Sequence, residues 1–104
     1  MIRVPKNRAA THPGEMLLEE FLIPLGISQK HLAEAIHVPF QRVNQIVSGK
    51  RGVTPSTALR LAKFFDMSPG FWLNLQMRCD LQQAEKSEQL ALRDIRPMRR
   101  APLR

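Results

Sequence analysis

Cysteine and aromatic residues are scarce in this sequence. Its 104 residues include one cysteine, Cys79, and no tyrosine. A single cysteine permits no disulfide within the chain, and a fold without disulfides is typical of a reducing compartment. With one tryptophan and five phenylalanines, the chain offers little for a site that stacks sugars or nucleobases. Disulfide-stabilised secreted scaffolds are therefore excluded.

Long apolar runs are also absent. No stretch reaches the roughly 18 residues of a membrane-spanning helix, and the first 15 residues carry cations without the apolar core of a signal peptide. The arginines near the C-terminus would suit an anionic membrane, but no amphipathic apolar segment accompanies them, so a solvated tail or a nonspecific DNA-binding arm fits better. We expect a cytoplasmic protein that does not bind membranes.

No pattern of catalytic or metal-binding residues is present either. His12, His31, His37 and Cys79 lack the spacing of metal ligands, and there is no glycine-rich phosphate loop. Cys79 falls on an apolar helix face, where a cysteine packs as a small apolar residue more often than it acts as a nucleophile. We expect a protein that is not an enzyme and holds no cofactor and no metal.

Positive charge is abundant and unevenly distributed. The formal net charge is +7, which favours a polyanionic partner without specifying a fold. Residues 13–27 nevertheless contain three glutamates and no cation, whereas residues 38–51 contain three cations and no acidic side chain. A chain of this length forms one small domain. We predict a flexible basic arm at 1–11, a domain at 12–85 and a basic, flexible tail at 86–104.

The most informative stretch is residues 28–51, which predict two short amphipathic helices joined by a tight turn. Ser28 is expected to cap the first helix by accepting from the amide of His31 or Lys30. The turn at residues 37–39 requires His37 to adopt a left-handed conformation, which histidine tolerates better than most residues. This pattern is a helix-turn-helix.

The second of these helices, at about residues 40–48, separates apolar from polar side chains at 100° per residue. The predicted inner side consists of Phe40, Val43, Ile46 and Val47, and Gly49 is the predicted C-terminal cap. Glutamine and asparagine can bond adenine and arginine can bond guanine in the major groove. The predicted base-reading residues are Gln41, Arg42, Asn44 and Gln45. Asn44 has the alternatives of supporting its neighbours or bonding a phosphate.

Polar residues around this helix are expected to hold phosphates and to set the register without reading sequence. They are Ser28, Gln29, Lys30, Lys50, Arg51 and Thr54. A solvated polar face is the alternative for each of them, and for Lys30 the two interpretations are balanced.

Three further helices flank this pair. The first is predicted to begin at Pro13 and to end at Pro24 and Gly26, with an apolar side and a row of glutamates. Capping signals at residues 54–55 and 68–69 begin the other two. The last, at residues 70–85, is apolar on two faces, one with Phe71, Trp72, Leu75 and Cys79 and the other with Leu73, Met77, Leu81 and Ala84. Because so small a domain cannot cover both, we expect one face to pack against a second subunit.

The motifs HPGE, GIS, RVN-I--GKR, TP-TALRLAKFF and SP-FWLNLQ, spread over residues 12–84, resemble the HigA-type antitoxins, also called virulence-associated protein I, of the XRE-like helix-turn-helix group. The resemblance implies a homodimer that binds a palindromic operator in its own promoter and silences a HigB/RelE-like toxin that cleaves mRNA on the ribosome. Asp66-Met67 and Gly70 depart from the family pattern, and residues 85–104 match none of it.

We therefore expect an all-α, five-helix helix-turn-helix domain of the lambda-repressor-like type that dimerises through its C-terminal helix. The expected dimer contacts are Leu73, Met77, Leu81, Phe71 and Trp72, with the choice of face left open. The expected toxin contacts are Glu15, Glu19 and Glu20, for which a solvated helix face is the alternative. Two other functions stay open: a stand-alone phage-type or metabolic repressor, and an inhibitor that neutralises a ribonuclease by contact alone.

Overall fold

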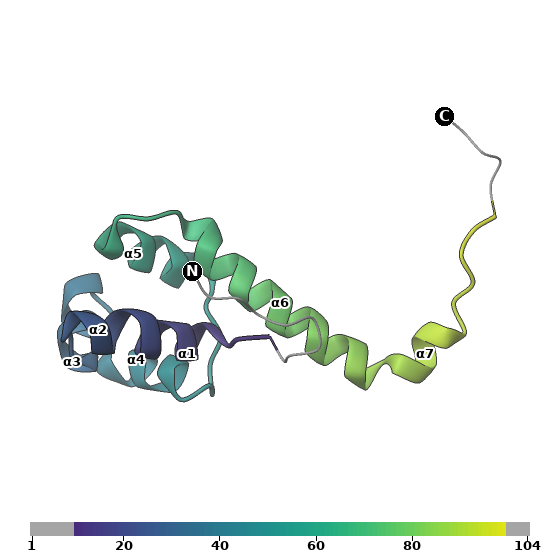
Figure 1. Cartoon of the computed structure of the whole chain (residues 1–104), viewed down its shortest axis with the longest axis horizontal. Coiled ribbons are helices and arrows are strands. Elements are labelled where there is room, and N and C mark those ends of the chain that lie inside the picture. Colours follow the sequence, from purple (N-terminus) through teal and green to yellow (C-terminus); the bar gives the residue numbers. More distant parts are fainter. Residues whose placement is uncertain (1–9, 100–104) are drawn as a thin grey trace.

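The computed structural model describes residues 10–99, which form helices and no strand. The elements are α1 (Pro13–Met16), η1 (Leu17–Leu22), α2 (Ile23–Leu25), α3 (Gln29–Ile36), α4 (Phe40–Val47), α5 (Pro55–Phe65), α6 (Pro69–Ser87) and α7 (Gln89–Arg93). The first three are continuous and make one helical segment. The expected all-α class and its helix-turn-helix pair, α3 and α4, are confirmed (Figure 1).

Pro24 does not end the first helical segment, contrary to our prediction. It lies inside α2, and the segment ends at Gly26, which has a φ of +66°. Proline lacks an amide donor and its ring crowds the preceding turn of an α-helix. Here the preceding turns, η1, are π-helical, and Ile23 N–H bonds the carbonyl of Leu18 five residues back. The wider turn accommodates the Pro24 ring.

Three predicted hydroxyl caps begin helices as expected. Their oxygens accept from backbone amides two or three residues later: Ser28 from His31 at 3.0 Å, Thr54 from Thr57 at 3.4 Å and Ser68 from Gly70 at 3.1 Å. These bonds satisfy amides that have no partner within the helix. The starts of α3, α5 and α6 are therefore set by local sequence.

The core lies where the first helical segment, α3, α4 and α5 meet the first half of α6. Trp72 of α6 has no exposed surface, and Leu17, Leu32, Val43 and Leu61 are each exposed by 1% or less. Phe21 and Phe65 pack beside the indole, with ring centroids 4.8 Å apart. One core thus holds both helices of the helix-turn-helix pair.

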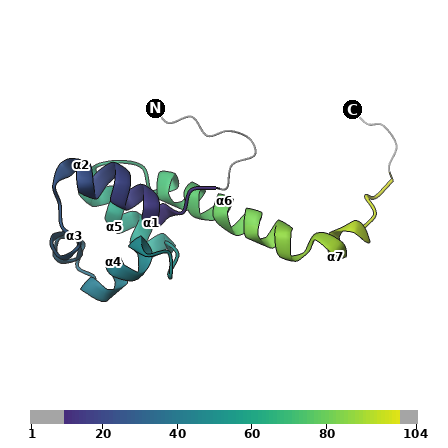
Figure 2. The same cartoon turned by 60° about the horizontal axis from the view of Figure 1, so that its bottom comes forward.

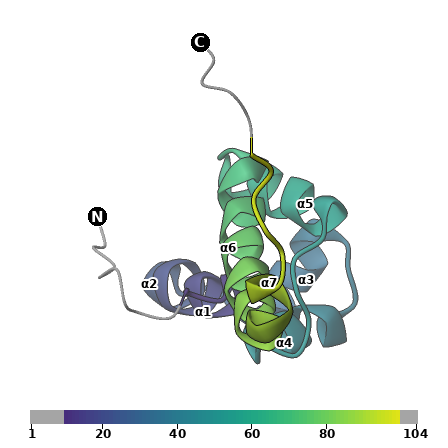
Figure 3. The same cartoon turned by 90° about the vertical axis from the view of Figure 1, so that its right-hand side faces the viewer.

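The second half of α6 and α7 extend away from this body (Figure 1, Figure 2), and the molecule measures 55 × 31 × 26 Å. Seen from the α7 end, α1 and α2 lie on one side of α6 and α3 and α5 on the other (Figure 3). The α6 helix continues to Ser87, past the predicted boundary at residue 85. Helix α7 follows within the predicted tail.

The predicted arm at residues 1–11 lies outside the described residues except for its end. Ala10 N–H donates to Gln82 Oε1 at 2.9 Å, and the thiol of Cys79 donates to the carbonyl of Thr11 at 3.2 Å. These two arm residues therefore contact α6. In the tail, Arg100 and Arg104 lie outside the described residues.

Candidate nucleic-acid interface

The turn between α3 and α4 has the strained conformation that the sequence predicts. His37 has a φ of 60°, and Val38 N–H bonds the carbonyl of Ala33 at 3.0 Å, which closes the end of α3. Arg60 of α5 donates from Nη1 to the carbonyls of Ile36 at 2.8 Å and His37 at 3.4 Å. Its cation lies where a helix C-terminus attracts positive charge. Arg60 therefore holds the turn.

Gly14 determines how closely α1 approaches α4. It is buried, and a Cβ atom added to it would lie 1.8 Å from the carbonyl oxygen of Ile46. No side chain fits in that space. Sequence reasoning missed this role, although a glycine in the first turn of a helix is a signal for close backbone contact. His12 Nδ1 accepts from the amide of Gly14 at 2.9 Å and thereby caps α1.

The two sides of α4 are largely as predicted. Val43 and Ile46 are buried and Val47 is half-buried, whereas Gln41, Asn44 and Ser48 are exposed. Arg42 and Gln45 are half-buried and lie at the edges of the exposed side.

Phe40 is a correction, because we placed it on the inner side and it is 51% exposed. Helical periodicity gives a residue's direction around the axis, but it does not say whether another element covers that end of the helix. Phe40 is the first residue of α4, and the core cluster does not include it.

Gln45 is held by the loop that follows α4. Its side-chain Oε1 accepts from Arg51 Nε at 3.0 Å, and its backbone carbonyl accepts from the amides of Lys50 at 2.8 Å and Arg51 at 3.2 Å. Gly49, with a φ of +80°, allows the chain to fold back here. Arginine only donates, so the amide oxygen of Gln45 faces Arg51 and its Nε2 remains a donor. Arg51, which we assigned to phosphate contact, thus positions Gln45, which we assigned to base reading.

Asn44 meets the start of α3. Its Nδ2 donates to Gln29 Oε1 at 3.1 Å, which is the supporting contact that we gave as one alternative for Asn44. Lys30 and Lys50 are exposed, and Ser28 and Thr54 are exposed at helix starts where their hydroxyls act as caps. The predicted base-reading and phosphate residues therefore lie around α4 and the starts of α3 and α5.

The predicted toxin-binding glutamates lie on the first helical segment, in α1 and η1. Glu15, Glu19 and Glu20 are all exposed.

Burial raises the pKa of the Cys79 thiol, and the charge of Asp80 adds to the effect. A raised pKa disfavours the thiolate that a nucleophile requires.

The faces of α6 differ more than the sequence indicates. Trp72, which we assigned to the dimer interface, is completely buried in the core of one chain and cannot supply contact surface to another. Phe71 is half-buried against that indole, with centroids 5.1 Å apart. On the opposite face, Met77 and Leu81 are 52% and 56% exposed. The apolar face that remains uncovered is therefore the one with Leu73, Met77 and Leu81.

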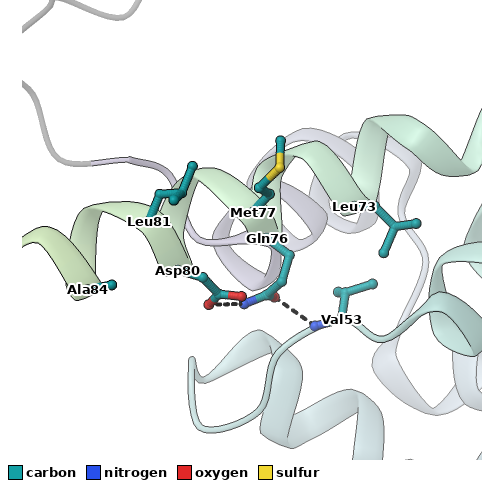
Figure 4. Close-up of a pocket in the computed structure, with 7 residues that line it drawn as sticks. All are labelled: Val53, Leu73, Gln76, Met77, Asp80, Leu81 and Ala84. Carbon is teal, nitrogen blue, oxygen red and sulfur yellow. Dashed lines mark hydrogen bonds between the residues drawn. The ribbon is translucent and has the colours of Figure 1, made fainter. Parts of the chain in front are cut away.

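A groove of about 500 Å³ follows this uncovered face (Figure 4). Its lining residues are Val53, Leu73, Gln76, Met77, Asp80, Leu81 and Ala84. The amide of Gln76 accepts from Val53 N–H at 2.7 Å and donates to Asp80 at 3.0 Å. The bond with Val53 ties α6 to the loop between α4 and α5, and the bond with Asp80 lies within α6.

Within residues 10–99, no helix has the length and apolar character needed to cross a bilayer. Within the same residues, no three histidine, cysteine or acidic side chains gather as metal ligands would.

Known proteins resemble this chain closely. A helix-turn-helix family model matches residues 18–72. Virulence-associated protein I of Dichelobacter nodosus is 49% identical over 80 residues, which cover 77% of this chain and 74% of that protein. Antitoxin HigA-1 of Vibrio cholerae is 40% identical over 93 residues, which cover 88% and 87%. The solved structure of the Pseudomonas aeruginosa antitoxin HigA with the higBA promoter has a TM-score of 0.82 at 39% identity, covering 86% of this chain and 98% of that one.

Proposed function

Since the chain belongs to the HigA-type antitoxins of the helix-turn-helix family, we propose that it represses its own promoter and neutralises a toxin. It binds operator DNA through α4 and captures a HigB/RelE-like toxin that cleaves mRNA. Both activities are binding functions exercised in the cytoplasm and need no catalysis. The observation that carries the proposal is the exposed polar side of α4, together with the HigA relative whose structure contains promoter DNA.

The DNA half of the proposal assigns α4 to the major groove. Gln41, Arg42, Asn44 and Gln45 read base edges, and each good bidentate pair is worth about 1–3 kcal/mol of discrimination. Lys30, Lys50 and Arg51, with Ser28, Gln29 and Thr54, hold phosphates beside the groove. Affinity that depends on phosphate neutralisation falls as salt is added, with a slope of about 0.9 per phosphate in log units.

We propose that the DNA-binding dimer forms through the groove on α6. Met77 and Leu81 expose apolar surface next to the half-buried Leu73. Pairing of two such faces around a two-fold axis would cover that surface. A two-fold dimer presents its α4 helices about 34 Å apart, one turn of duplex, and so requires an inverted-repeat operator.

The toxin half of the proposal uses the glutamates of α1 and η1. Glu15, Glu19 and Glu20 are exposed on a chain whose net charge is +7, so they would be repelled by DNA and attracted by a basic ribonuclease. The DNA-binding and toxin-binding surfaces thus have opposite charge. The two surfaces are on different helices.

Gel shifts on the chain's own promoter, with and without the adjacent toxin, test the proposal. We expect binding to the promoter at salt concentrations where a scrambled duplex is released, and we expect inhibition of the toxin's mRNA cleavage at one-to-one stoichiometry. Promoter binding without toxin inhibition would indicate a stand-alone repressor. Toxin inhibition without sequence-specific promoter binding would indicate an inhibitor that acts by contact alone.

A further inference from the structure

Phe40 is an exposed apolar side chain next to exposed polar residues of α4. It is 51% exposed and is the first residue of α4, directly before the exposed Gln41 and one helical turn before the exposed Asn44. None of the aromatic pairs found within residues 10–99 includes it. Packing in the core therefore does not account for a phenylalanine at this position.

The location of Phe40 suggests a role in recognition. A recognition helix presents residues near its N-terminus to the base edges of the major groove. The edges of guanine, cytosine and adenine in that groove carry hydrogen-bonding groups, and thymine alone adds an apolar group, its 5-methyl. An exposed aromatic ring can bury that methyl but can form no hydrogen bond with the other edges.

We propose that Phe40 is a specificity-determining residue that packs against the 5-methyl group of a thymine in each operator half-site. This inference rests on the proposed DNA-binding function and deepens it. Gln41 is adjacent in the chain and carries the amide that bonds adenine N6 and N7. Phe40 and Gln41 together fit neighbouring A·T pairs, in which one residue reads the thymine and the other the adenine.

The expected effect follows from the size of one methyl group. Burying a single methyl strengthens binding about fourfold. A dimer that makes this contact in both half-sites would gain about 15-fold, provided that the two contacts are independent. Such a preference is large enough to measure and small enough to leave residual binding when it is lost.

Replacement of thymine by uracil tests this contact, because uracil lacks only the methyl. Duplexes of the chain's own promoter, made with dTTP or with dUTP, are titrated with the full chain by fluorescence anisotropy. The unaltered protein is expected to bind the thymine duplex about 4- to 15-fold more tightly. Phe40→Ala and Phe40→Gln should bind both duplexes with nearly equal affinity, with unchanged circular dichroism.

Gln41→Ala is the matched control on the same turn of α4. It should bind more weakly than the unaltered protein and keep the preference for thymine over uracil. An equal preference in the unaltered protein and both Phe40 variants would overturn the role of Phe40 while leaving DNA binding intact. An unaltered protein that does not distinguish its promoter from a scrambled duplex would instead overturn the proposed function.

Discussion

At the scale of single residues, small or paired side chains position the recognition helix. Gly14 leaves room for the carbonyl of Ile46, Arg60 holds the end of α3, and Arg51 orients Gln45. None of these contacts would itself read DNA. Each restricts where α4 or one of its side chains lies, which is what precise recognition requires.

The first residue-scale prediction concerns Gly14. Gly14→Ala is expected to lower the free energy of unfolding by roughly 1–3 kcal/mol, because its Cβ would overlap the backbone of α4 and force the two helices apart. Gly70→Ala is the control, since its Cβ would lie 3.4 Å from Ser68 Oγ, within ordinary contact. Urea denaturation measures both variants. Equal stability of Gly14→Ala and the unaltered protein would contradict the close contact.

The second residue-scale prediction separates Arg51 from Lys50. If Arg51 orients Gln45 in addition to holding a phosphate, then Arg51→Ala should relax sequence preference in the same way as Gln45→Ala, and the double variant should lose little further preference. Lys50→Ala should instead weaken binding to promoter and scrambled duplexes alike and reduce the salt slope by about one. Anisotropy titrations over a range of salt measure both effects. Additive losses for Arg51 and Gln45 would show that they act independently.

At the scale of elements, α6 performs two tasks with two faces. Its inner face completes the core through Trp72, and its outer face forms a groove with Met77 and Leu81. The exposed fractions of these side chains show which face serves which task. A helical wheel cannot show this, because both faces are apolar. Substitutions on the two faces should therefore have different consequences.

We predict that charge on the outer face dissociates the proposed dimer without unfolding the chain. Met77→Glu and Leu81→Glu place a carboxylate on apolar surface that pairing would bury, which is costly when no partner charge is present. Because both side chains are more than half exposed in one chain, the monomer should keep its helicity. Sedimentation velocity measures the oligomer, and Gln83→Glu, at an exposed position of the same helix, is the control. A dimer that persists in both groove variants would exclude this interface.

Truncation on the inner face should instead destabilise the monomer. Trp72→Ala removes the largest fully buried side chain and is expected to cost about 3–5 kcal/mol, since large-to-small changes in a core leave a cavity. Thermal denaturation followed by circular dichroism measures the loss. A stable Trp72→Ala monomer that no longer dimerises would return Trp72 to the interface.

At the scale of the whole molecule, charge is divided between surfaces. The chain carries +7 overall, yet Glu15, Glu19 and Glu20 lie on the first helical segment, whereas the cations Arg42, Lys50 and Arg51 lie on α4 and the loop after it. In the proposed function, these two groups of charge would attract partners of opposite sign.

We predict that reversing this acidic surface weakens toxin binding selectively. Glu19→Lys/Glu20→Lys should reduce toxin affinity, most strongly at low salt, and leave promoter affinity equal or slightly higher. Glu85→Lys/Glu88→Lys changes the net charge by the same amount on exposed residues near the C-terminal end of α6 and is the control. Calorimetric titration with the toxin measures the affinity. If both double variants bind the toxin as tightly as the unaltered chain, the glutamates are only a solvated face.

The sequence by itself determined the class of fold and the polar side of α4. The caps at Ser28, Thr54 and Ser68 follow from hydrogen bonds that span two or three residues. The side of α4 on which Val43 and Ile46 lie follows from helical periodicity. Sequence patterns record both directly. Left-handed His37 was predictable for the same reason.

Only the tertiary structure decided which side chains a distant element covers. It buried Trp72, left Phe40 exposed, brought Gly14 against Ile46 and joined Arg51 to Gln45. It also kept Pro24 within a helix by means of π-helical turns. Helical periodicity gives a direction around an axis, whereas burial depends on whether another helix lies in that direction. For this reason the predicted faces of α4 were largely correct, whereas the predictions for Phe40 on α4 and Trp72 on α6 were wrong.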